Sequence, residues 1–262
     1  MRVSGADVFR SEALKMPHGF LGRAGGVSTR EMWGLNVGYG SGDDPELIAE
    51  NRSRAIAAVL PGAELATVHQ IHSPAVVYVE QPWPQDERPH ADAMVTDRPD
   101  LLLGVLTADC APVLLADEEA GIVGAAHAGW RGAVAGVTDA TIAAMEGLGA
   151  ERNRIAAAVG PCIAQPSYEV DQAFRERFVD EGNDNTRFFT TGPAGKPHFD
   201  LPAYVLHRLK LARIASAEAL ALDTYSDVER FYSYRRSSHL GEPSYGRQIS
   251  MIGLRGTAPP KS

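Results

Sequence analysis

The sequence predicts an α+β fold, in which a large mixed β-sheet core is flanked by helices. The chain contains many short apolar runs separated by turn residues, a pattern typical of strands. Between them lie fewer, longer segments whose apolar residues have helical spacing. The chain has 262 residues, which suits one large domain. Its loose segments, at 81–89, at 181–186 and after Gly256, are too short to be interdomain linkers. We therefore expect a single domain over residues 1–262.

The composition narrows the function classes. Hydrophobic residues make up 44% and charged residues 22% of the chain, which is typical of globular proteins and excludes collagen-like, coiled-coil and disordered chains. The net charge of −8 disfavours general nucleic-acid binding. The 25 basic residues include few lysines, so cationic sites are expected to use arginine, which binds planar and tetrahedral anions through two parallel hydrogen bonds.

Cysteine usage and hydropathy indicate a reducing, cytoplasmic setting. There are only two cysteines, Cys110 and Cys162, fewer than a secreted disulfide scaffold would carry. Residues 1–10 contain no apolar run of signal-peptide length, and the most apolar stretch, 101–106, is too short to cross a membrane. We therefore expect two free thiols, each of which could be a ligand, a nucleophile or a core residue.

The first predicted helix has the clearest boundaries. Asp44 is suited to cap it, Pro45 to be its first residue, and apolar positions continue from Leu47 to Val59, before Pro61. Later runs are assigned by length, spacing and turn residues. The remaining predicted helices are 134–148, 168–179 and 201–215, and the predicted strands are 65–72, 75–80, 91–96, 101–107, 112–116, 122–127, 155–159, 187–191, 219–224 and 248–254.

Two predicted strands end in reactive side chains. The run 101–107 leads into Asp109 and Cys110, at the kind of position that often faces a cleft. A buried core thiol is the competing interpretation, because free cysteine is among the most buried residue types. The run 122–127 ends at His127.

A glycine-rich turn follows His127 and leads into a predicted helix. Its amides and Arg131, within Gly129–Gly132, are suited to an anion such as phosphate. An ion pair between Arg131 and a surface acid is the alternative. No dinucleotide-binding glycine motif follows any strand.

Two further histidines, His69 and His72, lie three residues apart on a predicted strand. Because strand side chains alternate between faces, at most one of them faces a given site. A lone strand histidine is more often structural than a ligand. Together, however, His72, Cys110 and His127 form a donor set found in catalytic zinc sites, with a fourth position open. The same atoms could instead form a Cys110–His127 nucleophile and base pair, so the residues alone leave both alternatives open.

The chain also contains an ordered series of motifs that resembles a known family, the YfiH family, also called the laccase-domain or polyphenol oxidase family. The resemblance covers about residues 18–254. The motifs are His18-Gly-Phe-Leu-Gly-Arg-Ala-Gly-Gly-Val-Ser28, Asn36-Val-Gly, Gly42-Asp-Asp-Pro45, Asn51-Arg52, Gln70-Ile-His-Ser73, Ala91-Asp-Ala-Met-Val-Thr96, Thr107-Ala-Asp-Cys110, His127-Ala-Gly-Trp-Arg-Gly132, Gly160-Pro-Cys-Ile163, Tyr168-Glu-Val170, Ser233-Tyr-Arg-Arg236 and Gly246-Arg247.

This resemblance implies a fold shared with the catalytic domain of cytotoxic necrotizing factor toxins, and Zn²⁺ held by His72, Cys110 and His127. It implies phosphorolysis of adenosine, inosine, guanosine and methylthioadenosine, and deamination of adenosine by a water molecule that zinc activates. Copper-dependent phenol oxidation, a metal-free Cys–His hydrolase and a role in editing peptidoglycan precursors are the alternatives. The expected partners are purine nucleosides and phosphate, without nucleic acid or membrane.

Several further residues are candidates for substrate contacts. Arg131 and Gly132 are the first candidates for phosphate, and Arg23 and Ser28 are weaker ones. Asn36 joins the substrate-binding set. Asp109 orients a histidine, moves a proton or is a plain carboxylate cap, and Cys162 lines the pocket or packs in the core. Three C-terminal arginines either contact substrate or, as we favour, hold the C-terminal strand: Arg235, Arg236 and Arg247.

The chain departs from the family pattern at two places. Gly22 stands where relatives usually have threonine or serine, and Tyr39-Gly-Ser41 stands where His-Val is common. Neither touches the proposed metal ligands, and both are positions where substrate preference could change.

Overall fold

The larger strands form two β-sheets. The computed structural model describes residues 5–256. The first sheet has five strands in the order β1-β2-β13-β6-β3, in which only the β3–β6 pair is parallel. Its strands are β1 (Val8–Phe9), β2 (His18–Leu21), β13 (Gln248–Gly253), β6 (Leu101–Thr107) and β3 (Glu64–Thr67).

The second sheet has six strands in the order β12-β9-β7-β8-β5-β4. Its two outer pairs, β12–β9 and β4–β5, are parallel, and the inner pairs are antiparallel. The strands are β12 (Ser216–Ala219), β9 (Ala156–Val159), β7 (Ala111–Asp117), β8 (Ile122–Ala128), β5 (Ala93–Thr96) and β4 (Val76–Tyr78).

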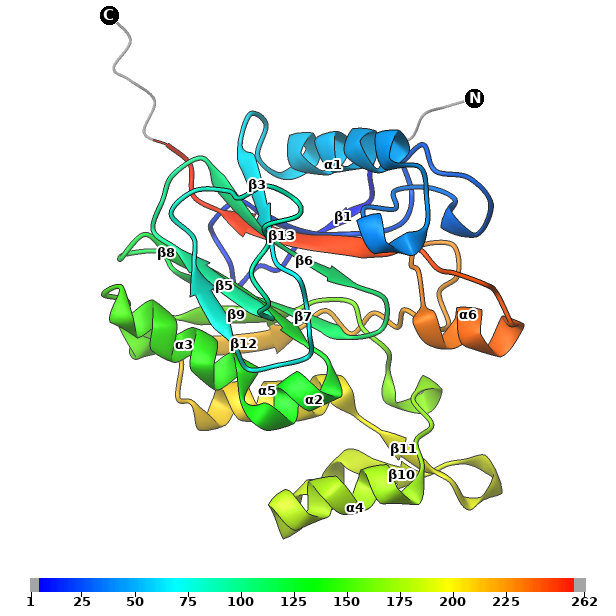
Figure 1. Cartoon of the computed structure of the whole chain (residues 1–262). Coiled ribbons are helices and arrows are strands. Elements are labelled where there is room, and N and C mark those ends of the chain that lie inside the picture. The colour runs from blue at the N-terminus through cyan, green and yellow to red at the C-terminus, as the bar shows by residue number, and fades with distance from the viewer. Residues whose placement is uncertain (1–4, 257–262) are drawn as a thin grey trace, which may run out of the picture.

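Helices cover the outer faces of both sheets (Figure 1). The helix α1 (Pro45–Val59) lies on the five-stranded sheet, while α2 (Trp130–Ala135), α3 (Val137–Gly147) and α5 (Leu201–Leu211) lie on the far side of the six-stranded sheet. The helix α4 (Gln172–Glu181) and the hairpin β10–β11 (Phe189–Thr191 and Pro197–Phe199) extend the structure below α2 and α5, and α6 (Tyr234–Leu240) lies to one side.

Three hydrophobic cores fill the spaces between these layers. Leu102 of β6 packs in the core beneath α1, whereas its neighbour Leu103 packs in the core between the sheets. Val113 of β7 packs against the helices of the other face, and Leu114 packs between the sheets. Because both faces of the central strands are buried, these strands read as continuous apolar runs. This architecture confirms the predicted α+β class with mixed sheets and flanking helices.

The first helix has the predicted N-terminus. The Asp44 side chain accepts a hydrogen bond from the Glu46 amide (2.8 Å), and Pro45 is the first helical residue. The predicted helix 134–148 is instead two helices, because Gly136 adopts a left-handed conformation (φ 88°) between α2 and α3. The predicted helix 168–179 begins later, at Gln172, where the Asp171 side chain accepts from the Phe174 amide (2.6 Å).

Other boundaries were predicted wrongly. The predicted strand 65–72 ends at Thr67, and His72 has a left-handed backbone (φ 59°), so His69 and His72 do not alternate along a strand. The strand predicted at 219–224 is β12, which ends at Ala219. The region 187–191 begins in a 3₁₀ turn (Asn183–Phe188), with only Phe189–Thr191 in a strand. The strands β1, β2 and β11 and the helix α6 were missed.

The two sheets adjoin at the end of β6. The strand β6 belongs to the first sheet and β7 to the second, so residues 108–110 cross from one to the other. Asp109 in this crossing has φ 90°. The pairing of Ala111 with Ala128 then places Cys110 beside the end of β8, where the chain enters α2. In residues 5–256, no helix has the length and apolar character needed to span a membrane.

At the opposite end of β7, buried Asp117 accepts hydrogen bonds from the amides of Ala120 (3.0 Å) and Glu151 (2.8 Å) and pairs with Arg154 (3.1 Å). Burial opposes its charge, but these bonds outweigh burial and lower its pKa. We predict that Asp117→Asn lowers the unfolding free energy by about 1–3 kcal/mol at neutral pH, because an amide cannot accept from all three donors.

The pH dependence has a defined sign. Because the folded-state pKa lies below the unfolded value of about 3.9, the stabilisation is complete above that value and is lost as pH falls through the folded pKa. Denaturant unfolding should therefore show the largest difference between variant and parent at neutral pH and a smaller one in acid. Glu119→Gln, which removes an exposed partner of Arg154, is the control. Equal stability of Asp117→Asn and the parent at pH 7 would contradict the prediction.

Candidate metal centre

Two imidazoles and a thiol meet where the sheets adjoin. The ligand atoms of His72, Cys110 and His127 lie within 4.8 Å of one another. His127 is buried, Cys110 is half-buried and His72 is exposed, so the group is closed on one side and open on the other. No other group of three or more histidine, cysteine or acidic side chains in residues 5–256 is arranged to hold a metal ion.

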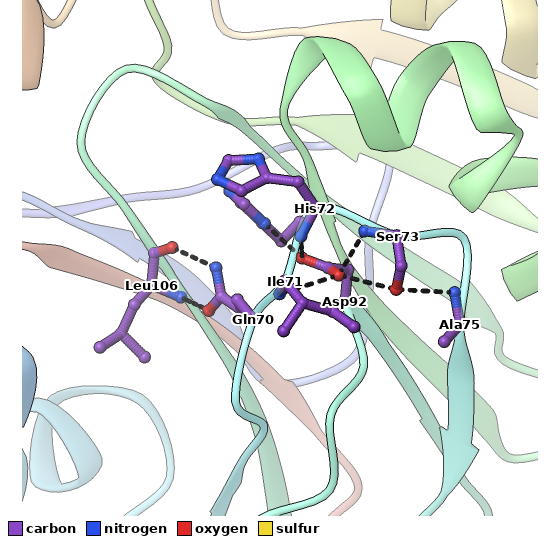
Figure 2. Close-up of polar contacts among 8 residues, drawn as sticks. Gln70, Ile71, His72, Ser73, Ala75, Asp92 and Leu106 are labelled. Carbon is purple, nitrogen blue, oxygen red and sulfur yellow. Dashed lines mark hydrogen bonds and ion pairs between the residues drawn. The ribbon is translucent and has the colours of Figure 1, made fainter.

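A buried carboxylate connects the two histidines. His127 Nδ1–H donates to Asp92 Oδ1 (2.8 Å), and the His127 amide donates to the Asp92 carbonyl (2.7 Å). The Asp92 side chain also accepts from the amides of Ile71 (3.1 Å), His72 (2.9 Å) and Ser73 (2.6 Å) (Figure 2). One side chain therefore holds the loop that carries His72 and fixes the ring of His127.

A second pair of hydrogen bonds, made by the Gln70 side chain, holds this loop against β6. Gln70 Nε2 donates to the Leu106 carbonyl (2.8 Å), and the Leu106 amide donates to Gln70 Oε1 (2.8 Å), so the side chain pairs with the strand end as a neighbouring strand would (Figure 2). The loop therefore bridges the end of β6 and the start of β5, and His72 is placed without regular secondary structure.

The titration behaviour of the group follows from burial and from its neighbours. The His72 side chain reaches the surface, but its ring is partly desolvated by the groups packed around it. This desolvation and the nearby His127 lower the pKa of His72, which keeps this imidazole neutral and able to bind a metal ion. Burial also opposes the charged form of His127, but Cys110 and Asp92 outweigh it and raise its pKa to about 9. Burial opposes the Asp92 carboxylate, yet hydrogen bonds from His127 and Ser73 lower its pKa to about 2.

The donor set fits a metal ion. The Nδ1 of His127 is occupied by Asp92, which leaves Nε2 for coordination, and a carboxylate behind a ligating histidine is the usual supporting arrangement. Two imidazoles and one thiolate suit Zn²⁺ or copper. A thiol, an imidazole and a carboxylate in series are also the parts of a metal-free nucleophile and base, but the second imidazole has no role in that arrangement.

Gly129 leaves the space in which the group assembles. A Cβ at this position would lie 2.5 Å from His72 Nδ1 and 3.0 Å from Cys110 Sγ. Its backbone is extended (φ −67°), a conformation that other residues adopt, so the demand for glycine is one of space alone.

Two cavities open from the group. The first, of about 540 Å³, is called here the aromatic cavity, and His72 and Cys110 lie in its wall. Its other characteristic residues are Trp130, Arg131, Tyr168, Tyr234, Arg235 and Tyr245. Flat aromatic faces and arginines are surfaces on which a purine ring stacks.

The second cavity, of about 290 Å³, is called here the arginine cavity. His72, Cys110 and His127 lie in its wall, and Tyr245 borders both cavities. Its other characteristic residues are Gly38, Tyr39, Gly40, His69, Gln70, Arg88, Thr107 and Arg247. The segment Tyr39-Gly-Ser41, where the sequence departs from the family pattern, therefore borders this cavity through Tyr39 and Gly40.

The structure brings part of the predicted substrate-binding set to the aromatic cavity. Arg131 lines it and is exposed, with no carboxylate partner in residues 5–256, so the predicted alternative of a surface ion pair is wrong. Gly132 is buried in the first turn of α2. Asp109 also lines the cavity, but it accepts from the Arg235 amide (2.7 Å) and the Thr224 hydroxyl (2.7 Å). This supports the cap alternative for Asp109, at the start of α6.

Other predicted residues lie elsewhere. Cys162 is buried in the core and lines neither cavity. Arg23 donates to the carbonyls of Trp33 and Val228, and Ser28 donates to Asp43 (2.6 Å); neither lines a cavity at the centre. Asn36 is buried, and its Oδ1 accepts from the amides of Gly38 (3.2 Å) and Arg247 (3.0 Å), so it supports the wall of the arginine cavity.

The C-terminal arginines differ in their roles. Arg236 donates to the carbonyls of Thr224, Tyr225 and Phe231, which is a structural role. Arg235 lines the aromatic cavity and Arg247 the arginine cavity, so these two reach the site.

Asp92, Gln70 and Arg88 were not identified as site residues. Asp92 and Gln70 lie within the motifs quoted above, which was the available signal, but hydrogen bonding to a distant histidine leaves no trace in local spacing. Arg88 lies in a proline-rich loop interpreted only as a loose segment.

Comparison with known proteins identifies the family. Residues 17–255 match the family model described as multi-copper polyphenol oxidoreductase laccase. The chain belongs to this laccase-like family, the YfiH family. A purine nucleoside phosphorylase of Deinococcus radiodurans is 38% identical over 257 residues, which cover 97% of this chain and 95% of that protein.

Solved structures of the YfiH family have the same fold. A Neisseria meningitidis protein superposes with a TM-score of 0.85 and is 32% identical, with 97% of this chain and 100% of that chain covered. The Bacillus licheniformis protein YfiH superposes with a TM-score of 0.80 and is 26% identical, with 91% and 92% covered.

The space at Gly129 gives a prediction about the metal. Gly129→Ala should reduce metal retention by about tenfold or more, because the added methyl group collides with the ring of His72 and the sulfur of Cys110. Metal analysis after dialysis against a weak chelator measures this. Gly147→Ala, in open space on α3, is the matched control and should retain metal as the parent does. Full metal content in Gly129→Ala would show that these side chains do not hold the ion.

Proposed function

We propose that the protein is a zinc-dependent purine nucleoside phosphorylase that also deaminates adenosine. The observation that carries the proposal is the placement of the His72–Cys110–His127 centre between the aromatic cavity and the arginine cavity. The name of the Deinococcus radiodurans relative supports the phosphorylase part of the proposal. Adenosine, inosine, guanosine and methylthioadenosine are the proposed nucleosides, and the two free thiols accord with a cytoplasmic location.

The centre would hold the metal through His72, Cys110 and His127. A bound Zn²⁺ supplies Lewis acidity and favours deprotonation of water at near-neutral pH. The residues of the chain then set the geometry. Asp92 orients His127 and the His72 loop. Because His127 is buried, substrate would reach the centre through the two cavities.

Phosphorolysis replaces one bond of the ribose carbon by another. A phosphate oxygen forms a bond to C1′ while the bond from C1′ to the purine nitrogen breaks, and the electron pair of that bond leaves with the purine, which takes up a proton. The products are ribose 1-phosphate and the free base. Arg131, an exposed cation in the wall beside His72, is proposed to neutralise phosphate oxygens.

Deamination uses the same cavity with water as the second reactant. The water oxygen forms a bond to C6 of adenosine, and the amino group leaves as ammonia after gaining a proton, which yields inosine. The aromatic cavity is large enough for a nucleoside, and its tyrosines and Trp130 provide stacking faces.

A metal-free thiol hydrolase is the second candidate. The series Cys110, His127 and Asp92 favours it, because His127 is held between a sulfur and a carboxylate. The deciding experiment incubates metal-analysed protein with adenosine, with and without phosphate, and identifies the products. Adenine formed only with phosphate supports phosphorolysis, and inosine formed without phosphate supports deamination. Activity that persists in fully demetallated protein supports the hydrolase, and phenol oxidation that depends on added copper supports the oxidase alternative.

Removal of the thiol separates these alternatives further. Cys110→Ala should lose zinc and phosphate-dependent release of hypoxanthine from inosine together, since one ligand of three is missing. Zinc content and hypoxanthine release are measured on the same sample. Cys162→Ala, the other cysteine changed in the same way, should keep its zinc. Unchanged phosphorolysis in Cys110→Ala would exclude the zinc mechanism.

The role of Arg131 is tested through phosphate. Arg131→Ala should raise the phosphate concentration needed for half-maximal hypoxanthine release by about tenfold, because a charge-assisted hydrogen bond to phosphate is lost. Steady-state rates at saturating inosine give this value. If the phosphate dependence of the variant equals that of the parent, Arg131 does not bind the phosphate.

A further inference from the structure

The arginine cavity has the chemistry of an anion-binding site. The proposed function does not use it, because Arg131, the residue proposed there to bind phosphate, lines the aromatic cavity. Its wall contains Arg88 and Arg247, and none of its lining residues is acidic. Neither arginine pairs with a carboxylate in residues 5–256. The guanidinium of a third arginine, Arg52, lies 4.6 Å from the ring centroid of Tyr39, at the border of the same cavity.

Unmet donors gather around this cavity. Across residues 5–256, only four buried side-chain nitrogen or oxygen atoms lack a hydrogen-bond partner, and three of them belong to Arg52, Thr107 and Arg247. Thr107 and Arg247 line the cavity, and Arg52 stacks on its Tyr39. A buried donor without a partner is unfavourable, so a cluster of them marks a place where a bound group or water completes the hydrogen bonding.

The charges of the cluster are also uncompensated. Burial lowers the pKa of Arg52 to about 10, and the neighbouring Arg88 adds to this lowering. Burial likewise lowers the pKa of Arg88. Arg52, Arg88 and Arg247 are half-buried. Like charges held together in a partly desolvated cluster, with no carboxylate paired to them, favour a bound anion that neutralises them.

The framework of the cavity holds these groups in place. The Arg247 guanidinium stacks on Tyr245 (4.5 Å from the ring centroid), and its Nη2 donates to the Tyr245 hydroxyl (3.2 Å). Arg88 Nε donates to the Gln85 carbonyl (2.8 Å). A Cβ at Gly38 would come within 3.1 Å of the Arg247 side chain, so a glycine there gives this arginine room.

Size and position decide what the anion is. The cavity, at about 290 Å³, is roughly half the volume of the aromatic cavity, and both have His72 and Cys110 in their walls. A nucleoside whose purine lies in the aromatic cavity would therefore have its ribose beside the centre and the arginine cavity beyond it. Planar guanidinium groups suit the tetrahedral oxyanion of phosphate.

We propose that the arginine cavity is a phosphate-binding subsite, formed by Arg88 and Arg247 and supported by Arg52. Its ligand is a phosphate group, either free orthophosphate as the second substrate or the 5′-phosphate of a nucleoside monophosphate. The choice between these two sources rests on the proposed function, whereas the binding of phosphate itself does not.

Direct binding tests the subsite without turnover. Orthophosphate is titrated into metal-analysed protein by calorimetry, for the parent, Arg88→Gln and Arg247→Gln, and inosine 5′-monophosphate is titrated in the same way. The affinity for one of these two ligands should fall about tenfold or more in both variants. Arg98→Gln, which removes an exposed arginine paired with Glu80 and Asp97, is the control and should bind as the parent does.

Kinetics then distinguish the two sources. A raised KM for phosphate with inosine as substrate, and an unchanged phosphate dependence in Arg131→Ala, assigns orthophosphate to the arginine cavity. A raised KM for inosine 5′-monophosphate, with the KM for inosine unchanged, assigns the 5′-phosphate instead.

A conservative variant tests whether Arg88 acts through its charge. Arg88→Lys, which keeps the charge, should recover part of either effect. A purely structural role of Arg88 would instead shift the thermal midpoint without a selective change in KM.

Failure of the subsite and failure of the proposed function give different results. Binding of phosphate that depends on Arg88 and Arg247, in a protein without phosphorolysis, retains the subsite and rejects the proposed function. Phosphorolysis with parental KM values for orthophosphate and for the monophosphate in both variants rejects the subsite and retains the function. Absence of binding of either ligand to the parent protein overturns the subsite.

Discussion

The site depends on one buried carboxylate. Asp92 accepts from three consecutive amides of the His72 loop and from His127, so it joins a segment without regular structure to the end of a central strand. An unpaired carboxylate at this depth would be strongly unfavourable, and these donors, together with the Ser73 hydroxyl (2.9 Å), make its charge stable. The left-handed backbone at His72 and the sharp crossing at Asp109 occur on either side of this interaction. The precision of the centre thus comes from hydrogen bonding and not from the strands alone.

The sequence predicted the elements whose information is local. The helix α1 has its cap, its proline and its apolar positions within a few residues, and β6 was predicted with its observed bounds because it is a continuous apolar run. Elements that depend on distant partners were not predicted. The strand β2 is four residues long and is specified by pairing with β13, more than two hundred residues away, and the division of the strands into two sheets follows from which face of each strand is buried.

The candidate centre was likewise predicted only in part: its three donors were found, and the residues that support them were missed. Its three donors were noted for their residue types, and the family resemblance then assigned them to a metal, although the argument from strand alternation used for His72 was wrong. Asp92 and Arg88 were missed because an acid and an arginine are common surface residues, and only the folded chain shows what they contact. Asn36 lies in a recognised motif, yet its contact with the Arg247 amide requires residues from opposite ends of the chain.

The balance of charge around the centre would link a bound metal to the proposed substrates. A divalent ion held by one thiolate ligand would keep one net positive charge, which the carboxylate of Asp92 would offset from behind His127. The cations that face the cavities, Arg131 on one side and Arg88 and Arg247 on the other, have no such offset. A neutral phenol would leave these charges unneutralised, whereas a phosphate group would neutralise them as it binds. The arrangement therefore favours a reaction in which an anion is a reactant, and it explains how a chain of net charge −8 presents cations where the chemistry takes place.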